Sequence, residues 1–287
     1  MNFIQFARAC GVVVNRLISD GRIHRCGSVA HPRSKNGAYA FDGERGWAMA
    51  WDAGDQVQWF SDPRAKPWTD DEKRTWMARR DAERRDQERR HQQAARAAED
   101  TLRACKTEEH GYLRLKGFPK LRGLVTADGA LFVPMRNVRT NALQGFQTIR
   151  WDAEARQWVK KMLYGMRAKG AVFRLGRSER ETVLCEGFAT GLSIDAALQQ
   201  MRVNASVLVC FSAQNMAHVA GQLGGRVYTF ADNDASGTGE AIAKQIGLPY
   251  CMAPVVGWDA NDWHQADGLV PLCAALMRLR QEAREPA

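Results

Sequence analysis

Three acidic residues in the second half of the chain follow short apolar runs that are typical of buried strands. Glu186 ends the run TVLCE at 182–186. Asp232 and Asp234 end the run RVYTFADND at 226–234. Carboxylates that meet at one edge of a sheet repel one another unless a cation lies between them, and hard oxygen ligands suit Mg²⁺ or Mn²⁺. We therefore predict a divalent metal site on Glu186, Asp232 and Asp234, of the kind used in phosphoryl or nucleotidyl chemistry.

An alternation of strand-like and helix-like segments brings these acids together. Residues 182–250 contain three strand-like runs, TVLCEG, SVLVCF and RVYTFADND, each followed by a helix-like run, FATGLSIDAALQQ, QNMAHVAGQL and GEAIAKQIG. This order is typical of a parallel α/β sheet. Functional groups in such sheets gather at the carboxyl ends of the strands. Acids 46 residues apart in the chain are thereby expected at one edge.

The Asp-x-Asp pair has an alternative interpretation, because Asp often does no more than cap the helix that follows it. The pattern E-G-x-x-T-G at 186–191, in the correct order upstream, favours the metal site over this alternative. Gly187 occupies the first strand–helix turn, where there is little room for a side chain. Ser236, Gly237 and Gly239 lead into the third helix, whose N-terminus could bind phosphate through backbone N–H groups.

These motifs resemble those of the Toprim domain, the catalytic fold shared by bacterial primases, type IA and II topoisomerases and some nucleases. The family has a Glu-Gly after the first strand and an Asp-x-Asp after the third, where this chain has Glu186-Gly187 and Asp232-Asn233-Asp234. The resemblance implies a further acidic metal ligand downstream. The segment GWDANDWHQADG offers Asp259 and Asp262, and we expect Asp262 to be the ligand.

Segments upstream resemble the basic lobe of DnaG-like primases of phages and plasmids. Four landmarks occur in the family's order, namely YLRLKGF (112–118), LFVPMRN (131–137), GFQTI (145–149) and KKML (160–163). The resemblance implies that basic residues here hold template or nucleotide phosphates, with Lys161 at the position of the family's lysine. The predicted phosphate-binding residues are Lys116, Arg136, Lys160 and Lys161. For any one of them, and for Arg136 above all, an ordinary surface charge is the alternative.

The resemblance implies a DNA primase that makes short RNA primers on single-stranded DNA from ribonucleoside triphosphates, with Mg²⁺ or Mn²⁺ as cofactor. A Toprim nuclease and a non-catalytic DNA-binding replication accessory are the alternatives. The chain has no G-x-x-x-x-G-K-[ST] motif, so any replicative helicase would be a separate protein. The 7 cysteines are scattered without a C-x-x-C pair, so neither a zinc ribbon nor a disulfide framework is expected.

Changes in composition divide the chain into four predicted parts. They are a small β-rich module (1–63), a charged helical connector (64–107), the basic lobe (108–178) and the Toprim domain with a C-terminal helix (179–287). The predicted fold class is α/β, with the parallel-sheet Toprim domain preceded by a basic α+β lobe. In the lobe, runs such as YLRLKGF read as strands, and RWDAEARQW (150–158) reads as a hairpin or a short loop after a strand that ends near Arg150.

Two features of the N-terminal third have more than one interpretation. Thr69 and Glu72 form a capping-box pattern before a helix that should reach about Lys106 and carries many arginines. We expect a solvated connector, with a helix lying along a phosphate backbone as the alternative. Three tryptophans, Trp47, Trp51 and Trp59, are expected to pack in a core or, alternatively, to stack on exposed bases.

Charge and hydropathy limit the partners. Lys and Arg total 41 and Asp and Glu total 32, for a formal net charge of +9, which favours a polyanion such as nucleic acid. No apolar run reaches the roughly 18 residues of a transmembrane helix, so no membrane partner is expected. The N-terminus lacks the features of a signal peptide, and a cytoplasmic location is therefore expected.

Overall fold

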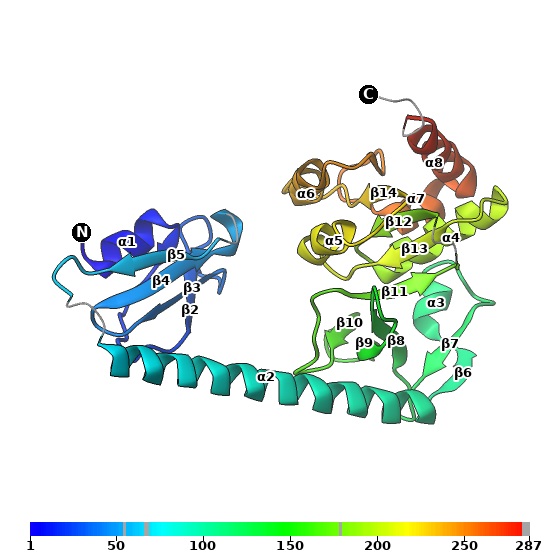
Figure 1. The fold of residues 1–287 in the computed structure, drawn as a ribbon. Coiled ribbons are helices and arrows are strands. Elements are labelled where there is room, and N and C mark those ends of the chain that lie inside the picture. The colour runs from blue at the N-terminus through cyan, green and yellow to red at the C-terminus, as the bar shows by residue number, and fades with distance from the viewer. Residues whose placement is uncertain (54–55, 66–68, 178–179, 283–287) are drawn as a thin grey trace. The chain divides into compact units, whose positions relative to one another are not determined.

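The computed structural model describes residues 1–53, 56–65, 69–177 and 180–282 (Figure 1). The chain divides into two compact units, Met1–Arg80 and Asp81–Ala287, which are described in turn. Within the described residues, no helix is both long enough and apolar enough to cross a membrane.

The N-terminal unit is built on a five-stranded antiparallel sheet whose strands are neighbours in chain order. The strands are β1 (Val12–Val13), β2 (His24–Ser28), β3 (Gly37–Phe41), β4 (Arg45–Ala50) and β5 (Gln58–Ser61), with a 3-10 turn η1 at Trp51–Ala53. This confirms the predicted small β-rich module. Helix α1 (Phe3–Ala9), which the sequence pattern did not predict, is fixed by a capping box between Asn2 and Gln5. Phe3 of this helix stacks on Phe41, with ring centroids 4.4 Å apart.

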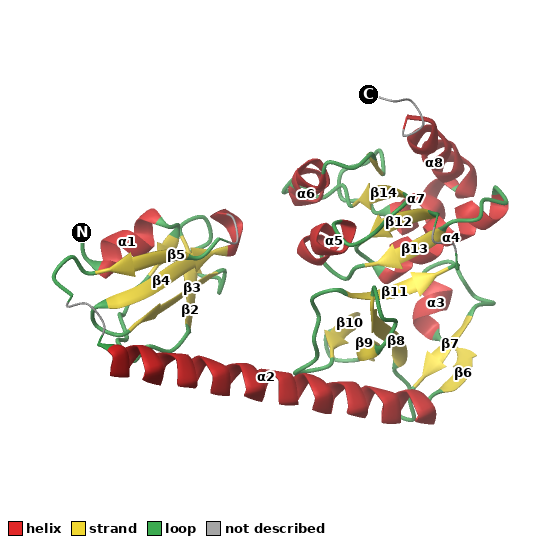
Figure 2. Ribbon diagram, viewed as in Figure 1, coloured by secondary structure: helices red, strands yellow, loops and turns green. Residues whose placement is uncertain are grey.

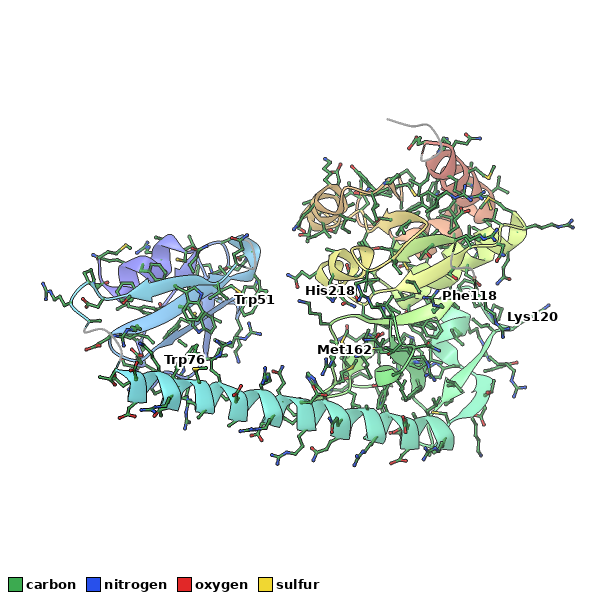
Figure 3. The ribbon with its side chains drawn as sticks, viewed as in Figure 1. Trp51, Trp76, Phe118, Lys120, Met162 and His218 are labelled. Carbon is green, nitrogen blue, oxygen red and sulfur yellow. The ribbon has the colours of Figure 1, made fainter. Side chains whose placement is uncertain are left out.

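Trp47, Trp51 and Trp59 do not belong to the apolar core of this unit. Trp59 on β5 is 68% exposed, so the expectation that it packs inside is wrong. Trp51 follows β4 (Figure 3) and is covered by Arg25, whose guanidinium carbon lies 3.9 Å from the ring centroid. The core consists of phenylalanine, tyrosine and small residues instead, because alternate residues of β3 and β4 face α1.

Helix α2 (Asp70–Ala104) is 35 residues long and begins in one unit and ends in the other. The predicted capping box is present, since the Thr69 N–H donates to Glu72 Oε2 at 2.7 Å and the Glu72 N–H to Thr69 Oγ1 at 3.3 Å. Residues 81–90 are exposed, as their composition predicts. The expectation of a wholly solvated connector is wrong further along, where Ala94 and Ala98 are buried.

The second unit contains one mixed sheet of ten strands (Figure 2). Its strand order is β10-β9-β8-β11-β13-β12-β14-β15, with β7 pairing β8 and β6 pairing β7. The strands of the lobe are β6 (Lys106–Glu109), β7 (Arg122–Val125), β8 (Leu131–Asn137), β9 (Leu143–Asp152), β10 (Gln157–Met162) and β11 (Ala171–Leu175). The remaining strands are β12 (Glu181–Cys185), β13 (Ser206–Val209), β14 (Arg226–Ala231) and β15 (Tyr250–Met252). The sheet therefore runs without a break from the basic lobe into the Toprim-like segment.

The last four strands in this order form the parallel part of the sheet, as the strand–helix alternation predicts. The helices are α3 (Gly111–Leu115), α4 (Phe188–Gln200), α5 (Ala213–Ala220), α6 (Thr238–Ile246), α7 (Ala260–Asp267) and α8 (Leu269–Glu282). Side chains of α4, α7 and α8 share one apolar cluster, and those of α5 and α6 share another. The two sets of helices thus cover opposite faces of the parallel strands (Figure 1).

The lobe differs from expectation in one segment. Residues 112–115, YLRL, were expected in a strand but lie in helix α3, whose N-terminus is capped by the His110 side chain. The neighbouring residues Tyr112 and Leu113 are both buried, whereas Leu115 is exposed, so the apolar side chains of this segment do not alternate between two faces as they would in a strand. The predicted hairpin at 150–158 is confirmed by the pairing of Asp152 with Gln157.

A buried ion-pair cluster joins the first parallel strand to the C-terminal helix. Glu181 is 4% exposed at its side chain and pairs with Arg280 of α8, and Arg226 Nη2 donates to it at 3.1 Å. Removing one partner of a buried pair leaves the other charge uncompensated. We therefore expect Glu181→Gln to lower the free energy of unfolding by about 3 kcal/mol in urea titrations. Arg226→Gln, at the more exposed partner, should cost less than about 1 kcal/mol, and equal losses would contradict this account.

Candidate functional site

The strand ends bring the predicted acids to one edge of the parallel sheet. Glu186 directly follows β12, and Asp232 directly follows the adjacent strand β14, where Leu184 is paired with Thr229. Both carboxylates are partly buried. The turn after β12 is tight, because a Cβ on Gly187 would come 2.8 Å from Thr190 Oγ1.

Asp232 is the carboxylate most strongly perturbed by its surroundings. Burial, followed by the charges of Asp259, Glu186 and Asp234, raises its pKa to about 7. Its Oδ1 atom is buried and has no hydrogen-bond partner within the described part of the chain. Burial and the charge of Asp234 also raise the pKa of Glu186. Because burial and neighbouring negative charge disfavour the charged forms of Asp232 and Glu186, a bound cation would stabilise those charges.

Asp234 has a different environment from Asp232. Its Oδ1 accepts hydrogen bonds from the Ser236 hydroxyl and backbone N–H, and its Oδ2 accepts the Gly239 N–H at 2.8 Å. These bonds, with the Ser236 hydroxyl first, lower its pKa. Asp234 thus stabilises the turn that starts α6, which is the capping role weighed as an alternative. A carboxylate has about four acceptor sites, so this role leaves lone pairs for another ligand.

The middle residue of the Asp-x-Asp motif connects two loops. Asn233 Nδ2 donates to the Ala253 carbonyl at 2.9 Å, and the Asn233 N–H donates to the Trp258 carbonyl at 3.2 Å. The Asn233 carbonyl in turn accepts the Gly257 N–H at 2.5 Å. These three hydrogen bonds hold residues 253–258 against the end of β14, and so they place Asp259 near Asp232. This role of Asn233 was not predicted from the sequence.

The two downstream acids lie in one capping box at the start of α7 but face different partners. Asp259 Oδ1 accepts the Asp262 N–H at 2.9 Å, and Asp259 Oδ2 accepts the Thr190 hydroxyl at 2.9 Å. The charge of Asp259 acts on Asp232. Asp262 Oδ2 accepts the Asp259 N–H at 3.2 Å, and its Oδ1 lies 3.7 Å from Lys116 Nζ. The acid coupled to Asp232 is therefore Asp259, while the predicted ligand Asp262 faces the lobe.

One lysine of the basic lobe faces the acidic residues. Part of the Lys160 side chain is exposed, but the protein around its ammonium group and the charge of Lys116 lower its pKa. The negative charges of Asp259, Asp232 and Glu186 act in the opposite direction and raise the pKa. Its Nζ also lies 5.6 Å from the centroid of the Tyr112 ring. Successive residues of a strand point to opposite faces, so Lys161 points away from these acids.

The other two predicted basic residues, Lys116 and Arg136, each take part in a hydrogen bond between a side chain and a backbone carbonyl. Asn261 Nδ2 of α7 donates to the Lys116 carbonyl at 2.9 Å, which fixes the end of α3 against the parallel-sheet part. Arg136 Nη1 donates to the Asn141 carbonyl at 3.1 Å, within the β8–β9 hairpin. Arg136 therefore does not join Lys160 and Lys116 near the acids.

The acidic edge fits a divalent cation that keeps part of its water shell. Within the described residues, no three His, Cys, Asp or Glu side chains lie close enough together to form a ready-made cluster. Mg²⁺ is usually held by one or two carboxylates, several waters and substrate phosphates. A buried, unpartnered oxygen on Asp232, on whose carboxylate the charges of Asp259 and Glu186 act, matches that requirement.

Gly239 provides a test of the geometry of this edge. A Cβ at this position would overlap the backbone carbonyl oxygen of Asp232. We expect Gly239→Ala to displace the start of α6 and to weaken Mg²⁺ binding about tenfold, as measured by calorimetric titration. Gly224→Ala is the control, because a Cβ there meets nothing within 4 Å. Unchanged Mg²⁺ affinity in Gly239→Ala would show that the loop geometry is not needed.

Comparison with known proteins identifies the domain that carries these acids. Residues 181–269 match the family model described as the Toprim domain, so the chain contains a Toprim domain. No curated protein matches the chain. Among solved structures, it is similar to a chain of the bacteriophage T7 lagging-strand DNA polymerase interacting with primase domains of two gp4 subunits bound to an RNA/DNA hybrid and dTTP. The identity is 14%, the match covers 61% of this chain and 91% of that one, and the TM-score is 0.40.

Proposed function

We propose that this protein is a DNA primase that synthesises short RNA primers on single-stranded DNA by Mg²⁺-dependent nucleotidyl transfer. The observation that supports it most is that the charges of Asp232, Glu186 and Asp259 in the Toprim domain act on Lys160 of the basic lobe. A cation opposite a metal-binding edge suits a substrate that carries both a triphosphate and a bound metal ion. Ribonucleoside triphosphates and single-stranded DNA are the proposed substrates, and a separate helicase is the proposed partner.

Each residue of the site has a proposed role. Asp232, Glu186 and Asp259 would hold Mg²⁺, and Asp234 would fix the loop and supply a further oxygen. Asp262 remains a predicted ligand, although its pairing with Lys116 gives it a second role in positioning that lysine. When bound, Mg²⁺ supplies positive charge that orients the triphosphate and offsets charge as the new bond forms.

The lysines complete the binding of the nucleotide. Lys160 would donate hydrogen bonds to a phosphate oxygen, and the attraction of the three carboxylates that act on it would hold it near the phosphates of a metal-bound nucleotide. Lys116, held through its backbone by Asn261, would contribute a second positive charge. The continuous sheet and this hydrogen bond keep lobe and Toprim domain in one compact unit, so the charges need no large rearrangement to act together.

A direct assay separates the candidate functions. The protein is incubated with single-stranded DNA, labelled ribonucleotides and Mg²⁺, with the Asp232→Asn variant as the control. We expect labelled oligoribonucleotides from the unaltered protein and none from the variant. Cleaved DNA without RNA synthesis would identify a Toprim nuclease, and DNA binding with neither product would identify an accessory protein.

A further inference from the structure

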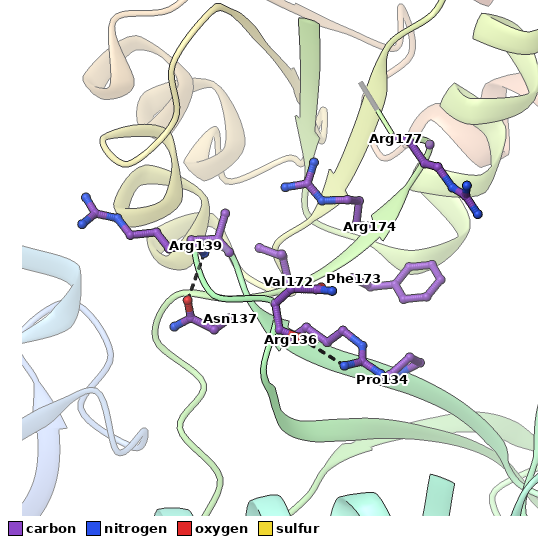
Figure 4. A pocket seen from close by; sticks show the side chains of 11 residues that line it. Pro134, Arg136, Asn137, Arg139, Val172, Phe173, Arg174 and Arg177 are labelled. Carbon is purple, nitrogen blue, oxygen red and sulfur yellow. Dashed lines mark hydrogen bonds between the residues drawn. The ribbon is translucent and has the colours of Figure 1, made fainter. Parts of the chain in front are cut away.

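A second basic site lies in the basic lobe, in a pocket of about 460 Å³ (Figure 4). It is formed by the end of β8, the turn that follows it and the segment from Val172 to Arg177. Four arginines line it, namely Arg136, Arg139, Arg174 and Arg177. None of its lining residues is acidic, and none belongs to the acidic edge described above. The pocket therefore concentrates positive charge with no carboxylate among the residues that line it.

The four guanidinium groups keep most of their hydrogen-bonding capacity. Arg136 donates to the Asn141 carbonyl, and none of the four forms an ion pair with a residue that the structure describes. Each guanidinium carries five N–H donors in a planar fork. Several donors thus remain available around a volume that is suitable for a small ligand.

More positive charge lies beside the pocket. The pKa of His218 on α5 (Figure 3) is lowered by burial and by the charges of Lys169 and Arg139. The Gly170 N–H, next to Lys169, donates to Asn215 Oδ1 at 2.7 Å, which holds this loop on α5. The charges of Lys169 and Arg139 both act on His218 and repel one another, and an anion bound between them would offset this repulsion. The surroundings therefore add to the affinity of the pocket for an anion.

We propose that this arginine pocket binds an anion with at least two phosphate groups, held by the guanidinium forks of Arg136 and Arg174 and by the charges of Arg139 and Arg177. Guanidinium matches phosphate through paired, charge-assisted N–H···O bonds. The two phosphates could belong to the polyphosphate chain of a free nucleotide or to successive nucleotides of a strand. This site rests on the proposed function and deepens it, because Arg136 is already expected to hold template or nucleotide phosphates, but binding here needs neither metal nor synthesis.

The test measures binding with EDTA present, so that the acidic edge cannot contribute through a metal ion. Inorganic tripolyphosphate and a single-stranded DNA oligonucleotide are titrated separately into the full-length protein. We expect at least one of them to bind, and Arg174→Gln and Arg136→Gln each to weaken that ligand about tenfold. Binding of tripolyphosphate assigns the site to free polyphosphates, and binding of DNA alone assigns it to a strand backbone.

Three controls keep the result specific. Arg278→Gln removes an exposed arginine of α8 and lowers the net charge by the same amount as Arg174→Gln. Because Arg278 does not line the pocket, this variant should change binding less than twofold. Arg174→Lys keeps the charge but loses the fork, and it should bind with intermediate affinity. Asp232→Asn should bind as the unaltered protein does, which separates this site from the proposed metal site. Equal weakening by Arg278→Gln and Arg174→Gln, or no binding of either ligand, would overturn the proposal.

Discussion

Asp232→Asn is expected to abolish primer synthesis and, without metal, to make the protein more stable at neutral pH. Synthesis should fall by at least about a hundredfold, because the substitution removes a charged oxygen from the centre of the proposed metal site. The gain in stability follows from the burial of Asp232 and from the charges of Asp259 and Glu186, which together raise its pKa to about 7. Asparagine has the same shape and no charge to repel.

The pH dependence distinguishes this explanation from a general effect on folding. The folded-state pKa of Asp232 lies above that of the unfolded chain, so the folded state binds the extra proton between about pH 4 and pH 7. The cost of the charge is therefore absent below about pH 4 and fully present above about pH 7. In EDTA, we expect Asp232→Asn to be more stable than the unaltered protein by about 2 kcal/mol at pH 8, and by little at pH 4.

Asp195→Asn is the matched control for this result. Asp195 on α4 is half-buried and its pKa is raised by burial, but it bonds Gln199 and lies outside the acidic edge. Its substitution should leave synthesis unchanged. Mg²⁺ should raise the melting temperature of the unaltered protein and of Asp195→Asn, and not that of Asp232→Asn. Full synthesis by Asp232→Asn would remove the proposed site.

Lys160→Met and Lys161→Met should have very different effects, although the two lysines are neighbours on β10. Lys160 faces the acids and should bind phosphate directly, so its loss is expected to raise the KM for nucleotides and to lower kcat/KM by about a hundredfold. Lys161 lies on the opposite face of the strand, and we expect a loss of less than about fivefold.

Synthesis measured over a range of nucleotide concentration checks both variants. Methionine preserves the unbranched stem of lysine, so both proteins should fold with unchanged circular dichroism. If Lys161→Met were the more damaging substitution, the family resemblance that points to Lys161 would be a better guide than the geometry of the strand.

The order of elements in the Toprim domain could be predicted from sequence because the strand and helix patterns there are distinct. Glu186 and Asp232 sit directly at strand ends, so their meeting follows from the topology of a parallel sheet. Two short helices were not predicted. Helix α1 lies in an N-terminal stretch without a clear period, and α3 has only 5 residues, which is too short to show one.

The finer assignment of the site residues could not be made from sequence. Asp259 and Asp262 are three residues apart around the first turn of α7, and only the packing of α7 against α4 determines which one faces Asp232. The choice between Lys160 and Lys161 depends on which face of β10 is turned toward the acids. Asn233 gave no signal, because its contacts are with a loop about 20 residues further along the chain.

The split character of helix α2 determines where the protein could be cut or recombined. The C-terminal half of α2 is part of the folded lobe, because Ala94 packs with Met135, Met166 and Ala171. Glu88 also forms an ion pair with Arg167. A fragment that starts after the helix would leave this apolar patch open to water and would tend to aggregate. The exchangeable part therefore ends inside a helix, and a chimaera that replaces the N-terminal unit should be joined within the exposed residues 81–87, in helical phase.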